Sequence, residues 1–300
     1  MRTVYLGTSP FAVTVLERLA RSPHRPALVV TRPDRPRGRG RRVTPPPVAE
    51  AARALGIEVA QPVRVNDPEA RELIAAARPE VVAICAFGAF LREPLLSAHE
   101  MLNVHPSLLP RWRGAAPIER AIEAGDEVTG VSIMRPTLEM DAGPVCLQRE
   151  EAIRPHDDYG SLSRRLAELG GELLVEALDT RPPCREQPRD GITYAEKIEA
   201  ADRRLDPARP AAELERRVRA LHPHIGAYVE LPNGEPLRVH RARASPDAGP
   251  PAGRLAADGR RLLYGTADGA LELLEVHPSG RRSMDAAAYL RGHAAELARR

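Results

Sequence analysis

Two side chains with the potential for chemistry lie close together in the segment 102–118, LNVHPSLLPRWRGAAPI. Asn103 and His105 are two residues apart, so both side chains would project from the same face of a β-strand that Pro106 ends. Such a strand end is where open α/β sheets bind ligands. An amide donor beside an imidazole suits a reaction that builds negative charge on a carbonyl oxygen. Taken alone, the pair is also explained by an asparagine that satisfies backbone groups and by a polar strand end.

A carboxylate in the segment 139–144, EMDAGP, is a candidate partner for this pair. Asp141 stands before Ala142 and Gly143, a pattern that is also typical of a plain turn. A neutral nucleophile that attacks a carbonyl must lose a proton. A carboxylate near a histidine can accept that proton or fix the tautomer of the imidazole. The spacing in the sequence does not by itself bring Asp141 to His105.

Other common chemistries find little support. The first predicted strand is followed by the single Gly7 rather than by the Gly-x-Gly-x-x-Gly of a dinucleotide site. Ser107 does not lie in the Gly-x-Ser-x-Gly pattern of a hydrolase nucleophile. The segment His222-Pro223-His224 offers two metal ligands without a third nearby, so a surface turn is the simpler interpretation. We therefore predict no metal site.

The elements that would position these residues alternate between strand and helix patterns. The run 81–87, VVAICAF, is continuously apolar, as in a central parallel strand buried on both faces. Ser9 is a candidate N-cap for a helix that begins at Pro10. The alternation predicts an α/β domain with an open, mostly parallel sheet. The predicted strands are 3–6, 27–30, 81–87, 101–104 and 128–134, and the predicted helices are 10–21, 47–55, 69–77 and 161–178.

The pattern changes near residue 180. Residues 180–190, TRPPCREQPRD, contain three prolines and read as a linker. An amphipathic helix at 211–221 is followed by short strand candidates beside Asn-Gly and Asp-Gly turn signals. We predict a first domain at 1–180, a linker at 181–204 and a smaller β-rich domain, which we expect to be a barrel, at 205–300. Its strand candidates are 226–231, 236–242, 261–265 and 271–276.

Composition limits the cellular setting. No apolar run approaches the roughly 18 residues of a membrane helix, and the segment MRTVYLGTSPFAV lacks the pattern of a secretory signal. Cys85, Cys146 and Cys184 are odd in number and widely spaced. They cannot form a disulfide framework or a cysteine zinc site, and they suit a reducing cytosol. We expect a cytoplasmic protein that does not bind membranes.

Positive charge is concentrated in two stretches. Residues 32–42 carry six arginines and one aspartate, and residues 203–300 carry 17 arginines and 12 acidic residues. Each stretch therefore has a net charge of +5, although the whole chain has only +3. Two separate basic surfaces favour a polyanionic partner such as a nucleic acid. Solvated arginines on loops explain the same pattern, and charge alone does not separate the two interpretations.

The segment HPSLLPRWRGAAPI, preceded by Asn103, resembles the signature of the methionyl-tRNA formyltransferase family. The wider folate-dependent formyltransferases share its Asn-x-His-x-Ser-Leu-Leu-Pro core. The resemblance extends over nearly the whole chain, through LGTSPFAV, RPDRPRGRGRRVTPPPV, ICAFGAFL, TGVSIM, EMDAGPV and TYAEKIEAAD. It implies a Rossmann-like N-terminal domain with an open parallel sheet and a smaller C-terminal β-barrel domain of the OB-like type.

The resemblance also implies an activity and its residues. The family transfers the formyl group of 10-formyltetrahydrofolate to the α-amino group of methionyl initiator tRNA, without a metal. Carried over by motif, Asn103, His105 and Asp141 are the catalytic residues. The resemblance places tRNA contacts on the inserted basic loop and folate contacts on two other segments. The expected tRNA-binding residues are Arg35, Arg37, Arg39, Arg41 and Arg42, and the expected folate-binding residues are Phe87, Gly88, Ser107, Leu108, Leu109 and Pro110.

Two alternatives remain open at this point. One is a related folate-dependent enzyme, either a sugar N-formyltransferase or a formyltetrahydrofolate hydrolase, since both can share the Asn, His and Asp set. The other is a catalytically inactive tRNA-binding protein, which the two basic surfaces would also suit. The arginine-rich insertion and the basic C-terminal part favour the tRNA formyltransferase, which we expect to be a monomer.

Overall fold

The computed structural model describes residues 1–37, 40 and 42–298. The chain forms two compact units. The first contains residues 1–117, 128–152 and 163–195, and the second contains residues 118–127, 153–162 and 196–300. The division therefore does not follow sequence order, because two short segments from the first 180 residues belong to the second unit.

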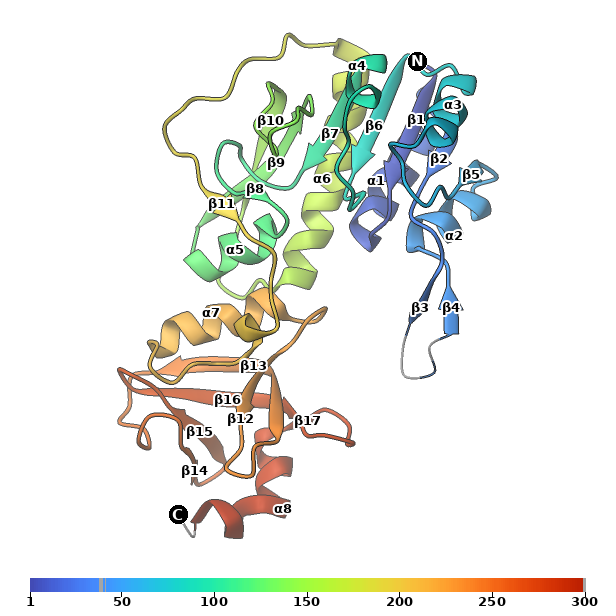
Figure 1. Ribbon diagram of the computed structural model, residues 1–300. Coiled ribbons are helices and arrows are strands. Elements are labelled where there is room, and N and C mark those ends of the chain that lie inside the picture. Colours follow the sequence, from blue (N-terminus) through green and yellow to red (C-terminus); the bar gives the residue numbers. More distant parts are fainter. Residues whose placement is uncertain (38–39, 41, 299–300) are drawn as a thin grey trace. The chain divides into compact units, whose positions relative to one another are not determined.

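The described residues of the first unit build a seven-stranded sheet in the order β10-β9-β7-β6-β1-β2-β5 (Figure 1). The strands β1, β2, β5, β6 and β7 are parallel, whereas β9 runs antiparallel to both β7 and β10. This confirms the predicted mostly parallel sheet. The strand bounds are β1 Thr3–Gly7, β2 Pro26–Val30, β5 Glu58–Ala60, β6 Val81–Cys85, β7 Met101–His105, β9 Val128–Met134 and β10 Val145–Ala152.

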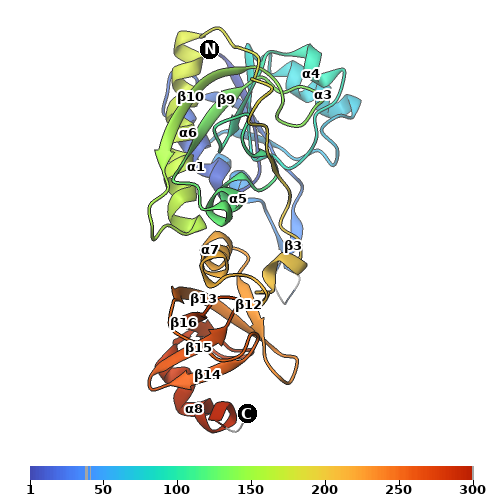
Figure 2. The same ribbon diagram turned by 90° about the vertical axis from the view of Figure 1, so that its left-hand side faces the viewer.

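Helices cover both faces of this sheet. Figure 2 shows α1 and α6 on one side of the strands and α3 and α4 on the other. The helix α6 packs closely against Val104 and Arg18 because Gly170 and Gly171 lack side chains. A Cβ at Gly170 would lie 2.8 Å from Val104, and a Cβ at Gly171 would lie 2.8 Å from Arg18. Ser9 caps α1 by accepting a hydrogen bond from Ala12 N, as predicted. The helix bounds are α1 Pro10–Ala20, α2 Pro47–Ala54, α3 Pro68–Ala76, α4 Leu95–Ala98 and α6 Tyr159–Thr180.

The first unit also contains two pairs of short strands outside the main sheet. The basic segment after β2 contains a short antiparallel pair, β3 Arg35–Arg37 with β4 Arg42–Thr44. Two further short strands, β8 Arg113–Gly114 and β11 Tyr194–Ala195, pair in parallel. Neither pair was expected from the sequence, because segments of two or three residues carry no periodicity.

The second unit is built on antiparallel strands. Within the described part of the chain they form a six-stranded sheet that runs β12-β13-β16-β15-β14, with β17 beside β16. Leu214 and Val218 of α7 join strand residues such as Val239 and Leu273 in one apolar core. This confirms the predicted β-rich C-terminal part. The bounds are η1 Ala201–Arg203, α7 Ala211–Leu221, β12 Ala227–Glu230, β13 Pro236–Ser245, β14 Leu255–Asp258, β15 Arg261–Gly265, β16 Ala270–His277, β17 Met284–Asp285 and α8 Ala286–Ala298.

The helix α5, Pro117–Ala124, belongs to this second unit apart from its first residue. Glu119 of α5 pairs with His224 at 2.9 Å, and Glu123 pairs with Arg217 of α7 at 3.3 Å. Arg216 donates to the Glu123 carbonyl at 2.9 Å. The His-Pro-His segment is a surface turn, as predicted, and its His224 also contacts α5.

The cysteines depart from the expectation of a chain whose cysteines suit a reducing cytosol. Cys146 of β10 and Cys184 form a disulfide across 38 residues of sequence, which the wide spacing of the cysteines gave no reason to expect. The pairing depends on the chain's return beside β10, where Val145 and Arg185 exchange backbone hydrogen bonds. Cys85 is a buried free thiol. None of the described helices is both long and apolar enough to span a membrane.

Candidate active site

The candidate site lies at the carboxyl end of β7. Asn103 stands opposite Ile84 of β6 and Met134 of β9, and His105 stands opposite Ser132 of β9. Both side chains therefore occupy the same face of the strand, as the sequence predicted. Within β7 only Asn103 is partly exposed, whereas His105 and the apolar residues are buried.

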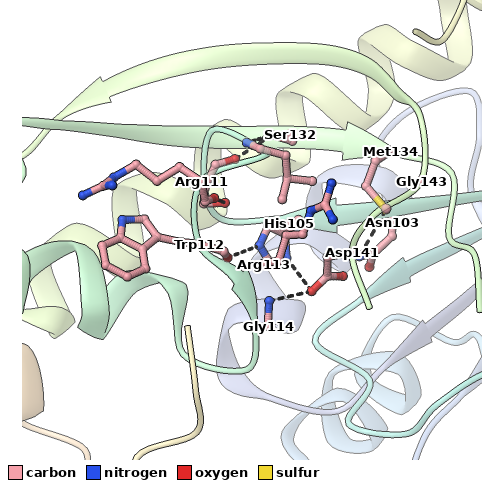
Figure 3. Close-up of polar contacts among 12 residues, drawn as sticks. Asn103, His105, Arg111, Trp112, Arg113, Gly114, Ser132, Met134, Asp141 and Gly143 are labelled. Carbon is pink, nitrogen blue, oxygen red and sulfur yellow. Dashed lines mark hydrogen bonds and ion pairs between the residues drawn. The ribbon is translucent and has the colours of Figure 1, made fainter. Parts of the chain in front are cut away.

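His105 is held on both sides of its ring (Figure 3). Its Nε2 lies 2.9 Å from the backbone oxygen of Trp112, and its Nδ1 lies 3.6 Å from Oδ2 of Asp141. A carbonyl oxygen only accepts, so Nε2 must carry a hydrogen in this arrangement. The residue is only 4% exposed. The Nδ1 edge is thus the side of the ring that meets the carboxylate.

Asp141 is positioned by its own backbone and by a neighbouring amide. Its φ is +49°, in the left-handed region, which aspartate tolerates better than most residues. Its Oδ2 accepts a hydrogen bond from Gly114 N at 2.9 Å. The structure therefore brings Asp141 to His105, a contact that the sequence spacing left open.

The amide of Asn103 has a weaker partner. Among the described residues, its Nδ2 lies 3.8 Å from Sδ of Met134. A thioether sulfur is a poor hydrogen-bond acceptor, so breaking this contact to form a stronger hydrogen bond costs little free energy. Figure 3 shows Asn103 on the same strand as His105, with Asp141 drawn between them in this view.

Hydrogen bonds hold the turn after β7 in place. Ser107 is fully buried, and its Oγ donates to the Arg111 carbonyl at 2.6 Å. Ser132 Oγ donates to the Ser107 carbonyl and accepts from Leu109 N, at 2.6 and 3.1 Å. The Ser107 hydroxyl is therefore engaged within the turn. Folate contact by this segment, including Leu108 and Pro110, stays a prediction.

The other expected binding residues lie in two places. Phe87 is buried just beyond β6, where its carbonyl accepts from Thr8 Oγ1 at 2.8 Å, and Gly88 has a φ of +75° that suits glycine. The side chains of Arg35 and Arg42 are exposed on β3 and β4, and Arg37 is on β3. Arg39 and Arg41, which we also expect to bind tRNA, lie outside the described residues.

Sequence reasoning missed one polar residue beside this site. Gln187, in the segment that we predicted to be a linker, donates to the carbonyls of Asp141 and Gly143. No local signal marks it, because its partners are more than 40 residues away. Over the described part of the chain, no group of three or more His, Cys, Asp and Glu side chains is arranged to hold a metal ion.

Comparison with known proteins agrees with this architecture. Residues 1–178 match the formyl transferase family, and residues 197–294 match the formyl transferase C-terminal domain. Two relatives named methionyl-tRNA formyltransferase are 46% identical (Halorhodospira halophila) and 44% identical (Methylococcus capsulatus). The alignments cover 97% and 98% of this chain, and 96% and 97% of the relatives.

Solved structures show the same fold at low sequence identity. HypX from Aquifex aeolicus in complex with tetrahydrofolic acid has a TM-score of 0.63 at 20% identity, covering 98% of this chain and 47% of that protein. WlaRD, a sugar 3N-formyl transferase, has a TM-score of 0.66 at 12% identity, covering 94% and 99%. The two domain matches together span most of the sequence, and the chain belongs to the formyl transferase family.

Proposed function

We propose that this protein transfers the formyl group of 10-formyltetrahydrofolate to the α-amino group of methionyl initiator tRNA, giving the N-formylmethionyl-tRNA used in translation initiation. The observation that carries the proposal is the 3.6 Å contact between Asp141, in the loop after β9, and His105, on the strand that also carries Asn103. The proposal is supported by two relatives named methionyl-tRNA formyltransferase, at 44% and 46% identity over almost the whole chain. We assign the reaction to the cytoplasm and expect a monomer.

The reaction needs a place for a proton. A bond forms between the amine nitrogen and the formyl carbon, and the bond between that carbon and the folate nitrogen breaks. The amine must lose a proton as it attacks, and the folate nitrogen must gain one as it leaves. We assign the acceptor to the Asp141 carboxylate. Because Nε2 of His105 faces the Trp112 carbonyl, Nδ1 is the ring atom through which His105 exchanges a proton with Asp141.

Negative charge on the formyl oxygen needs donors. We assign this task to the amide of Asn103, with His105 beside it. The contact between Nδ2 of Asn103 and the Met134 sulfur is weak, so the amide forms a stronger hydrogen bond when an oxyanion replaces the sulfur. The hydrogen-bonded turn after β7 holds the end of the strand, and preorganised charge stabilisation needs donors that are held in this way.

The two substrates call for different surfaces. We assign folate binding to Phe87, Gly88 and the turn 107–110. We assign the tRNA acceptor end to the arginines of the basic segment, because phosphates bind guanidinium groups strongly and in a salt-dependent way. The arginines assigned to tRNA are Arg35, Arg37, Arg39, Arg41 and Arg42.

One assay separates this function from its alternatives. Purified protein is mixed with 10-formyltetrahydrofolate and methionyl initiator tRNA, and N-formylmethionyl ester is measured. Parallel reactions omit the tRNA, or replace it with amino-sugar nucleotides. We expect formylation of the tRNA alone. Release of formate without tRNA would indicate a hydrolase, formylated sugar would indicate a sugar enzyme, and tRNA binding without transfer would indicate an inactive binding protein.

Variants of the catalytic set test the residue roles. Asn103→Ala and His105→Ala should each lower kcat by ~10²–10³, the usual cost of losing one such donor. Asp141→Asn should be comparably damaging, because the amide cannot accept the proton. Folate affinity, measured by equilibrium binding, should change little in all three. Near wild-type turnover in His105→Ala would contradict the assignment.

A further inference from the structure

The side-chain amide of Gln187 bonds both to Arg113, in the segment beside His105, and to the loop that carries Asp141. Gln187 Nε2 donates to the carbonyl oxygens of Asp141 and Gly143, at 2.7 and 2.8 Å. Its Oε1 accepts from Nε and Nη2 of Arg113, at 3.0 and 2.8 Å. Gln187 is half-buried, whereas the residues on either side of it are exposed. The side chain is therefore turned inward from an otherwise exposed segment.

The orientation of this amide is fixed by its partners. Carbonyl oxygens only accept hydrogen bonds and a guanidinium group only donates them. The nitrogen of Gln187 must therefore face the Asp141 loop, and the oxygen must face Arg113. Arg113 is only 5% exposed, and its remaining nitrogen, Nη1, lies 3.3 Å from Oε1 of Glu139. A buried guanidinium without the Gln187 oxygen would be left poorly solvated.

The two joined segments are those that set the geometry of the candidate site. The segment 111–114 supplies the Trp112 carbonyl to His105 and the Gly114 amide to the Asp141 carboxylate. The loop 139–143 carries Asp141 in a left-handed conformation. Gln187 bonds to both segments, so it fixes the distance between them without touching the carboxylate itself.

The segment that carries Gln187 is itself anchored. Arg185 and Val145 exchange backbone hydrogen bonds of 2.8 and 2.9 Å, and Cys184 is bonded to Cys146. Both anchors lie on β10, within five residues of Asp141. A glutamine at 187 therefore reaches the loop from a fixed starting point rather than from a flexible chain.

We propose that Gln187 is a positioning residue for formyl transfer: it braces the Asp141 loop against the segment 111–114 so that the carboxylate stays aligned with His105. This inference rests on the proposed function. It assigns a role in catalysis to the segment after α6, which reads as a plain linker in the sequence.

The test uses two variants of the full-length protein. Gln187→Met keeps the length of the side chain and removes all four hydrogen bonds. Gln187→Glu keeps an acceptor for Arg113 but replaces the donor by an oxygen that repels the carbonyls of Asp141 and Gly143. We expect both variants to lower kcat by ~10²-fold, the cost of a misplacement of about 1 Å. The KM values for folate and tRNA should stay close to those of the wild type.

Gln61→Met is the matched control. Gln61 also donates to a backbone carbonyl, that of Arg32, and also accepts from an arginine, Arg53. It has no contact with the Asp141 loop, so kcat should be retained. Each kcat is normalised to the folded fraction. Hydrogen exchange at the Gly114 amide, which donates to Asp141, provides a second readout that does not depend on activity.

The outcomes are distinct. Slower turnover with unchanged KM values and faster exchange at Gly114 in both Gln187 variants would support the proposal. Wild-type kcat in Gln187→Glu would overturn it, as would a decrease in Gln187→Met that disappears after normalisation to the folded fraction. If the wild-type protein itself fails to formylate tRNA, the proposed function fails. The exchange at Gly114 would then still show whether Gln187 braces the loop.

Discussion

Replacing Gly143 by alanine should displace the Asp141 loop. Gly143 is buried two residues after Asp141, and a Cβ at this position would lie 1.9 Å from the backbone oxygen of Arg135. Backbone cannot move aside as a flexible side chain can. Restoring an ordinary contact of about 3.4 Å would shift the loop by about 1.5 Å. The 2.9 Å hydrogen bond from Gly114 N to Asp141 would not survive such a shift.

The expected decrease in rate follows from that displacement. Misplacing a reacting group by about 1 Å costs ~10² in rate, equivalent to about 2.7 kcal/mol in the activation barrier. Overpacking should also lower the free energy of unfolding by ~1–3 kcal/mol. Turnover is measured by single-turnover formylation of methionyl-tRNA at a temperature where thermal melting shows the variant to be folded.

A matched glycine supplies the control. A Cβ at Gly292 on α8 meets nothing within 4 Å, so Gly292→Ala adds the same methyl group without a collision. It should keep the turnover of the wild type, and the melting temperature should not fall, because alanine favours a helix more than glycine does. A folded Gly143→Ala protein with wild-type turnover would refute the reasoning, because it would mean that the position of the Asp141 loop does not limit the reaction.

Three further predictions address other parts of the chain. Arg39→Glu combined with Arg41→Glu should weaken tRNA use and spare folate affinity. The slope of log K for tRNA binding against log salt concentration should become shallower by about one unit for each phosphate that the protein no longer binds. An unchanged slope would mean that these arginines do not bind phosphate. Burial raises the pKa of the Cys85 thiol to about 12, so at pH 8 only a fraction of ~10⁻⁴ of this thiol is ionised. Cys85 should therefore resist modification by a maleimide until the protein unfolds. Mass spectrometry of modified peptides before and after addition of urea checks this. Burial, together with the neighbouring histidine rings, holds the pKa of His240 below its usual value. The free energy of unfolding should therefore fall as the pH drops below about 6.5, because the unfolded chain takes up the proton first. Urea titrations at several pH values should show that His240→Gln lacks this contribution to the pH dependence of stability.

The strands and helices that the sequence predicted correctly have strong local patterns. The apolar run that contains β6 and the Ser9-Pro10 start of α1 depend on neighbouring residues only. Elements that escaped prediction lack such patterns. β5 has three residues, and β10 is a half-exposed edge strand whose sequence mixes apolar and charged residues. Their strand structure comes from pairing with β2 and β9, which local propensity does not encode.

The candidate site divides in the same way. The shared face of Asn103 and His105 follows from a spacing of two on a strand, and it could be predicted. The contact of His105 with Asp141 depends on the course of the chain through β9 and the loop behind it, 36 residues further on. Gln187 depends on a still longer return of the chain. A motif thus indicates which residues are present, whereas their distances require the tertiary fold.

The placement of α5 affects how the chain would behave if its backbone were cut. A protease that cleaved once within 186–195, after Cys184, would produce an N-terminal piece that keeps the disulfide to Cys146 and still carries α5 and residues 153–162, which lie almost entirely in the second unit. The bonds from Glu119 to His224 and from Glu123 to Arg217 would then join two separate polypeptides. The nicked protein should co-elute as one species and come apart only in denaturant. Expressed separately, the C-terminal half should keep its apolar core, whose buried members all lie between residues 205 and 290, but should lack the ion pairs to α5. Mixing the two halves should restore activity by complementation.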